Sequence, residues 1–372
     1  MSVGREQVRV DAAEVVADRV FAAASSRVAA GIIAALKERS AVSGIVHVGP
    51  HAVTGCREMS LAEVGLLQAV DLAAYERYQA TPSAPMLVPG DDYSLIPWSL
   101  AGFAANAAKL GADVVFTPSG LIHVGDSRAL AAVIEAGNDT GNPRVVTTVA
   151  VPQEWLTRTH RPRLLRELQH SIRPVALVVI GQLDPYEDPE VTQGLLDVLD
   201  AYPGKIFHHR TDMTAIETLG RGGLAASIGV TTSLRHTIPP GRRAQKRRRP
   251  ARPRRPLHVF VPGISEFRDI AELEGWFGDD APACTLAGCC TRPLTGFSHE
   301  AGDTELLAVH NVRGWLPLAE NLIACPPGGR RTWLRRHHLQ VETAYAELRV
   351  QTGVRAIRPY GSARVWSGGL GV

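Results

Sequence analysis

The chain has 372 residues, of which 45% are hydrophobic, a size that suits one large α/β barrel or two medium domains around a sizeable core. Five cysteines are too few for a disulfide scaffold, and three of them lie between residues 284 and 290, which favours metal chemistry. Acidic and basic residues interrupt the N-terminal apolar stretch, whose longest uncharged run, 28–36, is too short to span a bilayer. We therefore expect a soluble, cytoplasmic protein with no membrane partner.

The net charge of +3 conceals an uneven distribution. Residues 242–255 hold eight arginines and one lysine with no acid, so the rest of the chain carries a net charge of −6. Such a run repels itself and stays solvated. It suits either an insertion without a partner or a contact to phosphate backbones, with Arg247, Arg248 and Arg249 as the candidate nucleic-acid-binding residues.

In chain order, the first expected element is an Ala-rich N-terminal helical segment at residues 1–40. Short apolar segments then alternate with helical ones as far as residue 265. Most of the apolar segments are near-continuous strings, which is typical of parallel strands buried on both faces. The expected strands are 44–48, 86–88, 113–116, 145–151, 175–180, 205–208, 224–230 and 257–261, and the expected helices are 100–110, 127–136, 163–170, 190–202 and 214–220.

Eight strands with helical crossovers predict an α/β fold, a (β/α)8 TIM-type barrel over residues 41–265. An open doubly wound sheet is the alternative, but no GxGxxG follows any strand. The active site of a parallel barrel lies where its strands end, and polar residues follow several of the expected strands. We found no Ser/His/Asp triad spacing, and we expect His208 and His209 to be structural, because neighbouring strand residues point to opposite faces.

A cysteine-rich segment follows the barrel. We expect a zinc-binding subdomain at residues 266–325 and a C-terminal helix and tail at 326–372, with helices near 303–323 and 331–352. Cys284, Cys289 and Cys290 lie in a Pro/Gly-punctuated loop, and His310 follows on a helix. Three thiolates and one imidazole fill a closed tetrahedral zinc site. The alternative is three buried thiols beside a core histidine.

Two strand segments carry a resemblance to a known family. Residues 180–183 (IGQL), followed by Asp-Pro-Glu at 188–190, resemble an IGGL…GEPKE strand and turn, and residues 205–230 resemble a strand–helix–strand segment that ends in RG…FDCV. Both patterns belong to the tRNA-guanine transglycosylase superfamily, which includes relatives that modify DNA with deazapurines. The likeness spans about residues 86–319, and it implies substrate-binding roles for Gly181 and Gln182.

The cysteine segment carries the third part of this resemblance. The order Cys284, Cys289, His310-Asn311 is similar to the family's CxCxxC…HN zinc motif, with Leu286 at the middle cysteine and Cys290 as the available substitute. In the family, an Asp attacks the anomeric carbon of a flipped-out nucleotide and expels guanine, a deazaguanine base replaces it, and a second Asp handles protons.

The resemblance places Ser227 at the nucleophile position of FDCV, and it places the second Asp, from a TDSGGFQ strand end, near residues 89–90. From the residues themselves, Asp92 and Asp212 are the candidate catalytic carboxylates, with Asp184 behind them, although each of the three also suits a turn or a helix cap. Arg235, after a late barrel strand, is a candidate phosphate ligand, with a surface arginine as the alternative.

The sequence therefore predicts a glycosyltransferase that exchanges guanine for a deazapurine base in tRNA or DNA and contains structural zinc. Two alternatives stay open: a catalytically inactive nucleic-acid-binding relative of that family, and an unrelated barrel enzyme acting on a small phosphorylated substrate. The expected partners are nucleic acid and a purine or deazapurine base. A second copy of the chain, in a homodimer, is a further candidate partner.

Overall fold

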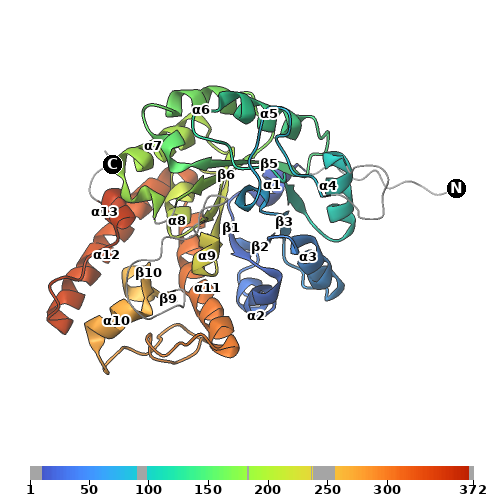
Figure 1. Cartoon of the computed structure of the whole chain (residues 1–372). Coiled ribbons are helices and arrows are strands. Elements are labelled where there is room, and N and C mark those ends of the chain that lie inside the picture. The colour runs from blue at the N-terminus through green and yellow to red at the C-terminus, as the bar shows by residue number, and fades with distance from the viewer. Residues whose placement is uncertain (1–10, 90–98, 182–183, 236, 238–255, 368–372) are drawn as a thin grey trace.

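The computed structural model describes residues 11–89, 99–181, 184–235, 237 and 256–367. Eight parallel strands form a closed barrel in sequence order, and β8 pairs with β1 to complete it (Figure 1). The (β/α)8 barrel predicted from the apolar strings is confirmed. Its strands are β1 (Val20–Ala24), β2 (Ser43–Val48), β3 (Gln68–Asp71), β4 (Val114–Phe116), β5 (Val145–Pro152), β6 (Val175–Ile180), β7 (Ile206–Thr211) and β8 (Ala225–Gly229).

Helices surround the barrel and continue beyond it. The longer predicted helices all form, with small shifts at their ends. The barrel helices are α1 (Ala12–Val16), α2 (Ser26–Lys37), α3 (Ala52–Leu61), α4 (Leu100–Lys109), α5 (Ser127–Asn138), α6 (Arg161–Leu168), α7 (Pro189–Ala201), α8 (Thr214–Gly220) and α9 (Thr232–Arg235). After them come α10 (Ile270–Phe277), α11 (Ala301–Ile323), α12 (Arg330–Thr352) and α13 (Gly361–Ser367).

Two of the eight predicted strands are wrong, and two real strands were missed. Residues 86–88 form only an isolated bridge through Met86. Residues 258–261 form β9 (His258–Val261), which pairs antiparallel with β10 (Glu266–Asp269) outside the barrel. The missing members are β1, which lies inside the segment predicted to be helical, and β3. Both are short, and the Ala-rich sequence of β1 matches a helix as well as a strand.

These strands move the predicted domain boundaries. The barrel begins at residue 20 rather than at 41, because β1 pairs with both β2 and β8. It ends with β8 and α9. The segment after it includes β9, because β9 pairs with β10 outside the barrel sheet and contacts α11. The described part of the predicted 1–40 helical segment therefore belongs to the barrel, whose strands lie between residues 20 and 229.

The barrel interior is filled with side chains. Phe21, Phe116 and Phe207 meet at its centre, with the Phe207 centroid 5.4 Å from that of Phe21 and 5.1 Å from that of Phe116. Small aliphatic residues from the other strands surround these rings. Successive strand residues alternate between the interior and the helix layer. The residues at the carboxyl ends of the strands form the barrel mouth above this core.

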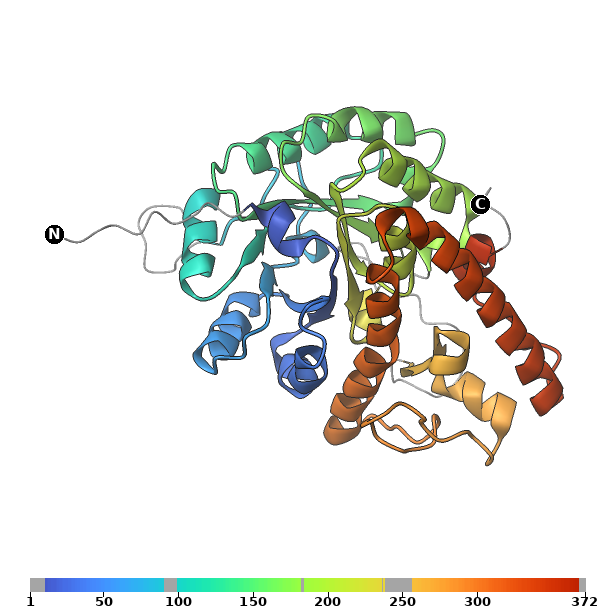
Figure 2. The same cartoon turned by 180° about the vertical axis from the view of Figure 1, so that it is seen from behind.

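The C-terminal segment packs along one side of the barrel. α11 lies against α2 and also contacts β1, α8 and β9. α11 and α12 form a V, with β10 and α10 between its arms (Figure 2). Among the described residues, no helix has both the length and the apolar character needed to cross a membrane.

Candidate metal centre and barrel-mouth site

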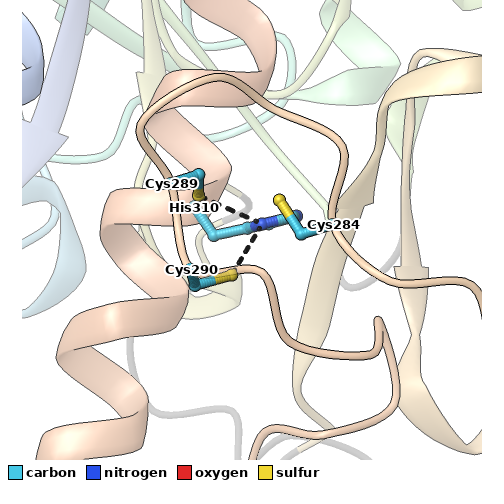
Figure 3. Close-up of side chains that lie close together, drawn as sticks. All are labelled: Cys284, Cys289, Cys290 and His310. Atoms are coloured by element: carbon cyan, nitrogen blue, oxygen red, sulfur yellow. Dashed lines mark hydrogen bonds between the residues drawn. The ribbon is translucent and has the colours of Figure 1, made fainter.

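The three clustered cysteines and His310 come together in one group. Their ligand atoms all lie within 4.8 Å of one another, and His310 and Cys284 are buried (Figure 3). The Nδ1 atom of His310 is 3.6 Å from Sγ of Cys289 and 3.7 Å from Sγ of Cys290. The predicted clustering of these four side chains is confirmed, and the group can hold a metal ion.

The spacing of the donors fits a tetrahedral ion. Bonds of about 2.3 Å to sulfur and about 2.05 Å to nitrogen, at the tetrahedral angle, separate the two donors by about 3.6 Å. Both observed nitrogen–sulfur distances agree with that value. Although Cys289 and Cys290 are adjacent in sequence, both sulfur atoms face the imidazole, so Cys290 supplies the third thiol in place of Leu286.

Contacts behind His310 fix its orientation. Its Nε2–H donates to the carbonyl of Phe260 at 2.8 Å, so Nδ1 is the nitrogen without a proton and faces the thiols. Burial lowers the pKa of His310, against a raising effect of the Phe260 carbonyl, and therefore favours the neutral imidazole that a metal requires. The next residue, Asn311, accepts a hydrogen bond from the Phe260 amide at 2.7 Å and donates to the His258 carbonyl at 3.0 Å. α11 is thereby joined to β9.

The thiols belong to a loop held by its own backbone. The amide of Cys284 donates to the Arg292 carbonyl at 2.7 Å, and the amide of Cys289 donates to the Leu286 carbonyl at 3.2 Å. Burial, followed by the neighbouring Cys284 and Cys290, raises the pKa of Cys289. A bound cation would stabilise the thiolate that burial and the neighbouring thiols oppose.

The second cluster lies at the barrel mouth and depends on an irregularity in β7. His208 pairs with Ala226 and Thr211 with Ile228, so the two residues between them face the single residue Ser227 of β8. This β-bulge turns both His209 and Arg210 toward the interior, since an extra residue breaks the alternation of a strand. Arg210 has a φ of +58°, which is uncommon outside glycine.

Asp71, the last residue of β3, is the centre of this cluster. Its Oδ2 accepts a hydrogen bond from the Tyr75 hydroxyl at 2.6 Å and lies 3.0 Å from Nε2 of His209. Its Oδ1 accepts from the Ala73 amide at 2.8 Å. Nδ1 of His209 lies 2.7 Å from Oγ of Ser227. Asp71, His209 and Ser227 therefore form a connected row, although the sequence showed no triad spacing; we name these three residues with Tyr75 and Arg210 the mouth network.

The ionisation of the mouth network follows from these contacts. Burial raises the pKa of Asp71. The hydrogen bond and charge interaction with His209, together with the hydrogen bonds from Tyr75 and from the Ala73 amide, outweigh burial, so the pKa of Asp71 is lowered overall. Burial also lowers the pKa of His209, and it outweighs the opposing effect of Asp71. The cluster is therefore an ionised carboxylate beside a neutral imidazole.

Arg210 joins the mouth network to the chain around it. Its guanidinium is buried, and NH1 donates to Oε1 of Glu76 at 2.5 Å and to the Tyr75 hydroxyl at 3.3 Å. The same Glu76 oxygen accepts from Thr237 at 2.9 Å, and NH2 of Arg210 donates to the carbonyl of Ser233 at 2.8 Å. These bonds hold the residues after β8 against the residues after β3.

The predicted catalytic carboxylates lie elsewhere or outside the described residues. Asp212 accepts from the amide and hydroxyl of Thr214, the first residue of α8. Asp184 accepts from the Tyr186 amide at the start of a short 3-10 helix. Asp92 falls outside the described residues, as do Gln182, Arg247, Arg248 and Arg249. Within the described part of the chain, the mouth network therefore includes none of the predicted carboxylates.

Three of the predicted site residues lie at or near the barrel mouth: Ser227, Arg235 and Gly181. Ser227 belongs to it, and its Oγ also accepts a hydrogen bond from the Arg210 amide at 2.9 Å. Arg235 is buried with its guanidinium 3.8 Å from the ring centroid of Phe267 and donates to Thr232 at 3.3 Å. Burial lowers the pKa of Arg235 to about 10. Gly181 lies directly after β6, also at the mouth.

The sequence prediction missed Asp71, Tyr75 and the inward direction of His209 and Arg210. A signal for Asp71 exists, because the run Gln68–Asp71 ends an apolar segment with a carboxylate. The inward direction of Arg210 has no comparable signal, since strict alternation predicts opposite faces for the adjacent residues His209 and Arg210.

Together, fold and clusters define a (β/α)8 barrel with a polar network at the mouth and a Cys3His group beside the barrel. No protein-family model and no curated protein matches the chain. Among solved structures, a probable tagatose 6 phosphate kinase from Sinorhizobium meliloti 1021 is similar over 94% of this chain and 97% of its own, with 14% identity and a TM-score of 0.33. The strand pairing itself defines the architecture.

Proposed function

We propose that this protein exchanges guanine for a deazapurine base in nucleic acid, as a relative of the tRNA-guanine transglycosylase superfamily with a structural zinc ion. The observation that carries the proposal is the row Asp71–His209–Ser227 at the barrel mouth. Ser227 stands at the family's nucleophile position by resemblance, and Asp71 meets it through a single imidazole.

The residues after Asp71 support this assignment. The family's strand end TDSGGFQ has an Asp, one further residue, two small residues and an aromatic ring. The stretch Asp71-Leu72-Ala73-Ala74-Tyr75 has the same order at the end of β3. This match is better placed than residues 89–90, because it falls at the carboxyl end of a barrel strand, where barrel enzymes hold their catalytic groups.

The chemistry of base exchange suits an ionised carboxylate at this position. Departure of guanine leaves positive charge on the sugar ring, and a nearby negative charge stabilises it. Asp71 is kept ionised by three hydrogen-bond donors, so it suits that electrostatic role. Zinc, when bound by the Cys3His group, would hold the loop against α11 and supply no step of the reaction.

Nucleic acid as the partner is supported by where the Arg-rich segment 242–255 joins the barrel. Its described flanks are Thr237, which is bonded to Glu76 of the mouth, and Pro256, whose carbonyl accepts from Thr232 at 3.5 Å. Thr237, five residues before the nine cations of this segment, therefore lies beside the mouth network. A polyanion bound by them would have its affinity reduced by salt.

A second candidate function, nucleic-acid binding without base exchange, is favoured by Ser227. A serine replaces the expected carboxylate nucleophile, it is fully buried, and its Oγ is bonded to His209 and to the Arg210 amide. A relative with this substitution would keep the recognition surface and lose the covalent step.

The test is incorporation of radiolabelled guanine into tRNA and into duplex DNA by the zinc-loaded protein. We expect exchange in one of the two polymers and its loss in Asp71→Asn. Asp126→Asn is the matched control, because Asp126 caps α5 and asparagine caps equally well. Binding without exchange would favour the second candidate, and absence of both would refute the proposal and leave the small-substrate barrel enzyme.

Nucleic-acid contact is tested separately by replacing Arg247, Arg248 and Arg249 together with alanine. We expect weaker binding. We also expect the slope of log affinity against log salt concentration to become shallower by about three, or about one for each phosphate contact that is lost. Unchanged affinity would remove the segment from the proposed interface.

A further inference from the structure

The hydrogen bonds of the mouth network can each be given a direction. The Asp71 carboxylate only accepts, so Nε2 of His209 must carry the proton of their 3.0 Å contact. The neutral imidazole then accepts at Nδ1, and the Ser227 hydroxyl donates to it at 2.7 Å. Oγ of Ser227 in turn accepts from the Arg210 amide. A chain of donors thus runs from Arg210 to Asp71.

A second chain begins and ends at the same residues. The guanidinium of Arg210 only donates, so it supplies the proton of its contact with the Tyr75 oxygen. The Tyr75 hydroxyl then donates to Oδ2 of Asp71 at 2.6 Å, the same oxygen that faces His209. Both chains leave Arg210 and converge on one oxygen, so a change of proton position at any member reverses or breaks a neighbouring bond.

We propose that His209 is a positioning residue: it holds the Asp71 carboxylate ionised and fixed in orientation, and it fixes Ser227 as a hydrogen-bond donor rather than a nucleophile. This inference rests on the proposed function, because it concerns the groups that prepare Asp71 for reaction. His209 itself is buried beneath the mouth and acts through Asp71.

The surroundings of His209 suit such a fixed role. Its ring lies edge-on to Phe116, with centroids 4.7 Å apart, and edge-on to Phe207 at 5.8 Å. The ionisable groups that face it are Asp71 from β3 and Arg210 from β7, and Tyr75 reaches it through the same Asp71 oxygen. Two aromatic rings and two directed hydrogen bonds leave the imidazole a single orientation and a single tautomer.

Substitutions separate this role from packing. In His209→Leu, an apolar side chain fills the space and both hydrogen bonds are lost. In His209→Gln, the amide can still donate to Asp71 and accept from Ser227. We expect a fall of at least about 100-fold in the exchange kcat for the leucine variant, an acid limb of the pH profile displaced upward by about one unit, and partial rescue of both by glutamine.

Ser227→Ala tests the second half of the proposal. We expect it to retain exchange within about tenfold of the unaltered protein, whereas loss of a nucleophile would abolish exchange. Leucine performing as well as glutamine, an unchanged acid limb, or complete loss in Ser227→Ala would each overturn the inference.

Nuclear magnetic resonance of the full chain labelled with ¹⁵N at histidine gives a readout independent of activity. We expect the His209 ring to be neutral and protonated at Nε2 at pH 7, with Ser227→Ala shifting its Nδ1 signal. If the protein exchanges no guanine, the proposed function fails, and the tautomer alone decides the inference: a His209 ring protonated at Nδ1 would refute it.

Discussion

Replacing His310 with alanine is the sharpest test of the metal centre. The change removes the single nitrogen donor and leaves the Phe260 carbonyl without its 2.8 Å hydrogen bond. An unsatisfied buried carbonyl costs about 1–3 kcal/mol on its own. The larger effect is loss of metal-linked stability, because the ligands are brought together only in the folded chain.

The magnitude follows from linkage. A metal present at 1,000 times its dissociation constant stabilises the folded state by about 4.1 kcal/mol. For a chain of this size, 1 kcal/mol corresponds to about 1.3 °C in melting temperature, so chelation is expected to lower Tm by about 5 °C. The effect should reach the barrel, because α11 carries His310 and packs against α2 and β1.

The assay combines elemental analysis with thermal unfolding, with and without a chelator. We expect about one zinc per chain in the unaltered protein, and in His310→Ala a lowered Tm that a chelator changes by less than about 2 °C. His299→Ala is the control, since His299 is exposed and close in sequence. Absence of metal from the purified protein, or an equal response to chelator in both variants, would refute the reasoning.

Two further predictions concern the stability of the fold. Gly194→Ala should lower the free energy of unfolding in urea by about 1–3 kcal/mol, because its Cβ would lie 2.0 Å from the Leu156 carbonyl oxygen, whereas Gly275→Ala, with open space around it, should gain up to about 1 kcal/mol. Burial lowers the pKa of His338, but its contact with Glu217 outweighs this and raises it, so the pair should stabilise the fold below about pH 6.5 and lose that contribution as pH rises through the folded pKa. Equilibrium unfolding against pH, with Glu217→Gln as the comparison, measures this, and an identical pH dependence in both would contradict it.

The Cys3His cluster could be predicted from sequence because the residues that form it lie close together in the chain. Three thiols within seven residues and an imidazole about twenty residues later are chemically unusual, and a loop followed by a helix can bring them together. What remained open was the adjacent pair Cys289 and Cys290. In the structure, the sulfur atoms of both neighbouring residues face one nitrogen. This arrangement depends on the loop conformation, which the spacing of the residues in the sequence does not specify.

The barrel was predicted correctly although two strands were misplaced. The long apolar strings of β5 and β6 identify a parallel sheet. The predicted number of eight strands was right because two strands were predicted wrongly and two real strands were missed. β3 has only four residues, too few for a periodic signal. That omission had a functional consequence, since Asp71 ends β3 and the sequence prediction placed the carboxylate at Asp92 instead.

The bulge in β7 explains why the mouth network could not be predicted by alternation. His208 contacts Tyr186 and Thr218 in the helix layer. Strict alternation predicts this outward direction, because the next residue, His209, points inward. One additional residue then turns Arg210 inward as well, and its amide and guanidinium begin both hydrogen-bond chains to Asp71. A regular strand would direct the Arg210 side chain toward the helices and leave Asp71 with fewer directed donors. The bulge in β7 therefore supplies donors that orient the Asp71 carboxylate, and the proposed chemistry depends on the negative charge of that carboxylate.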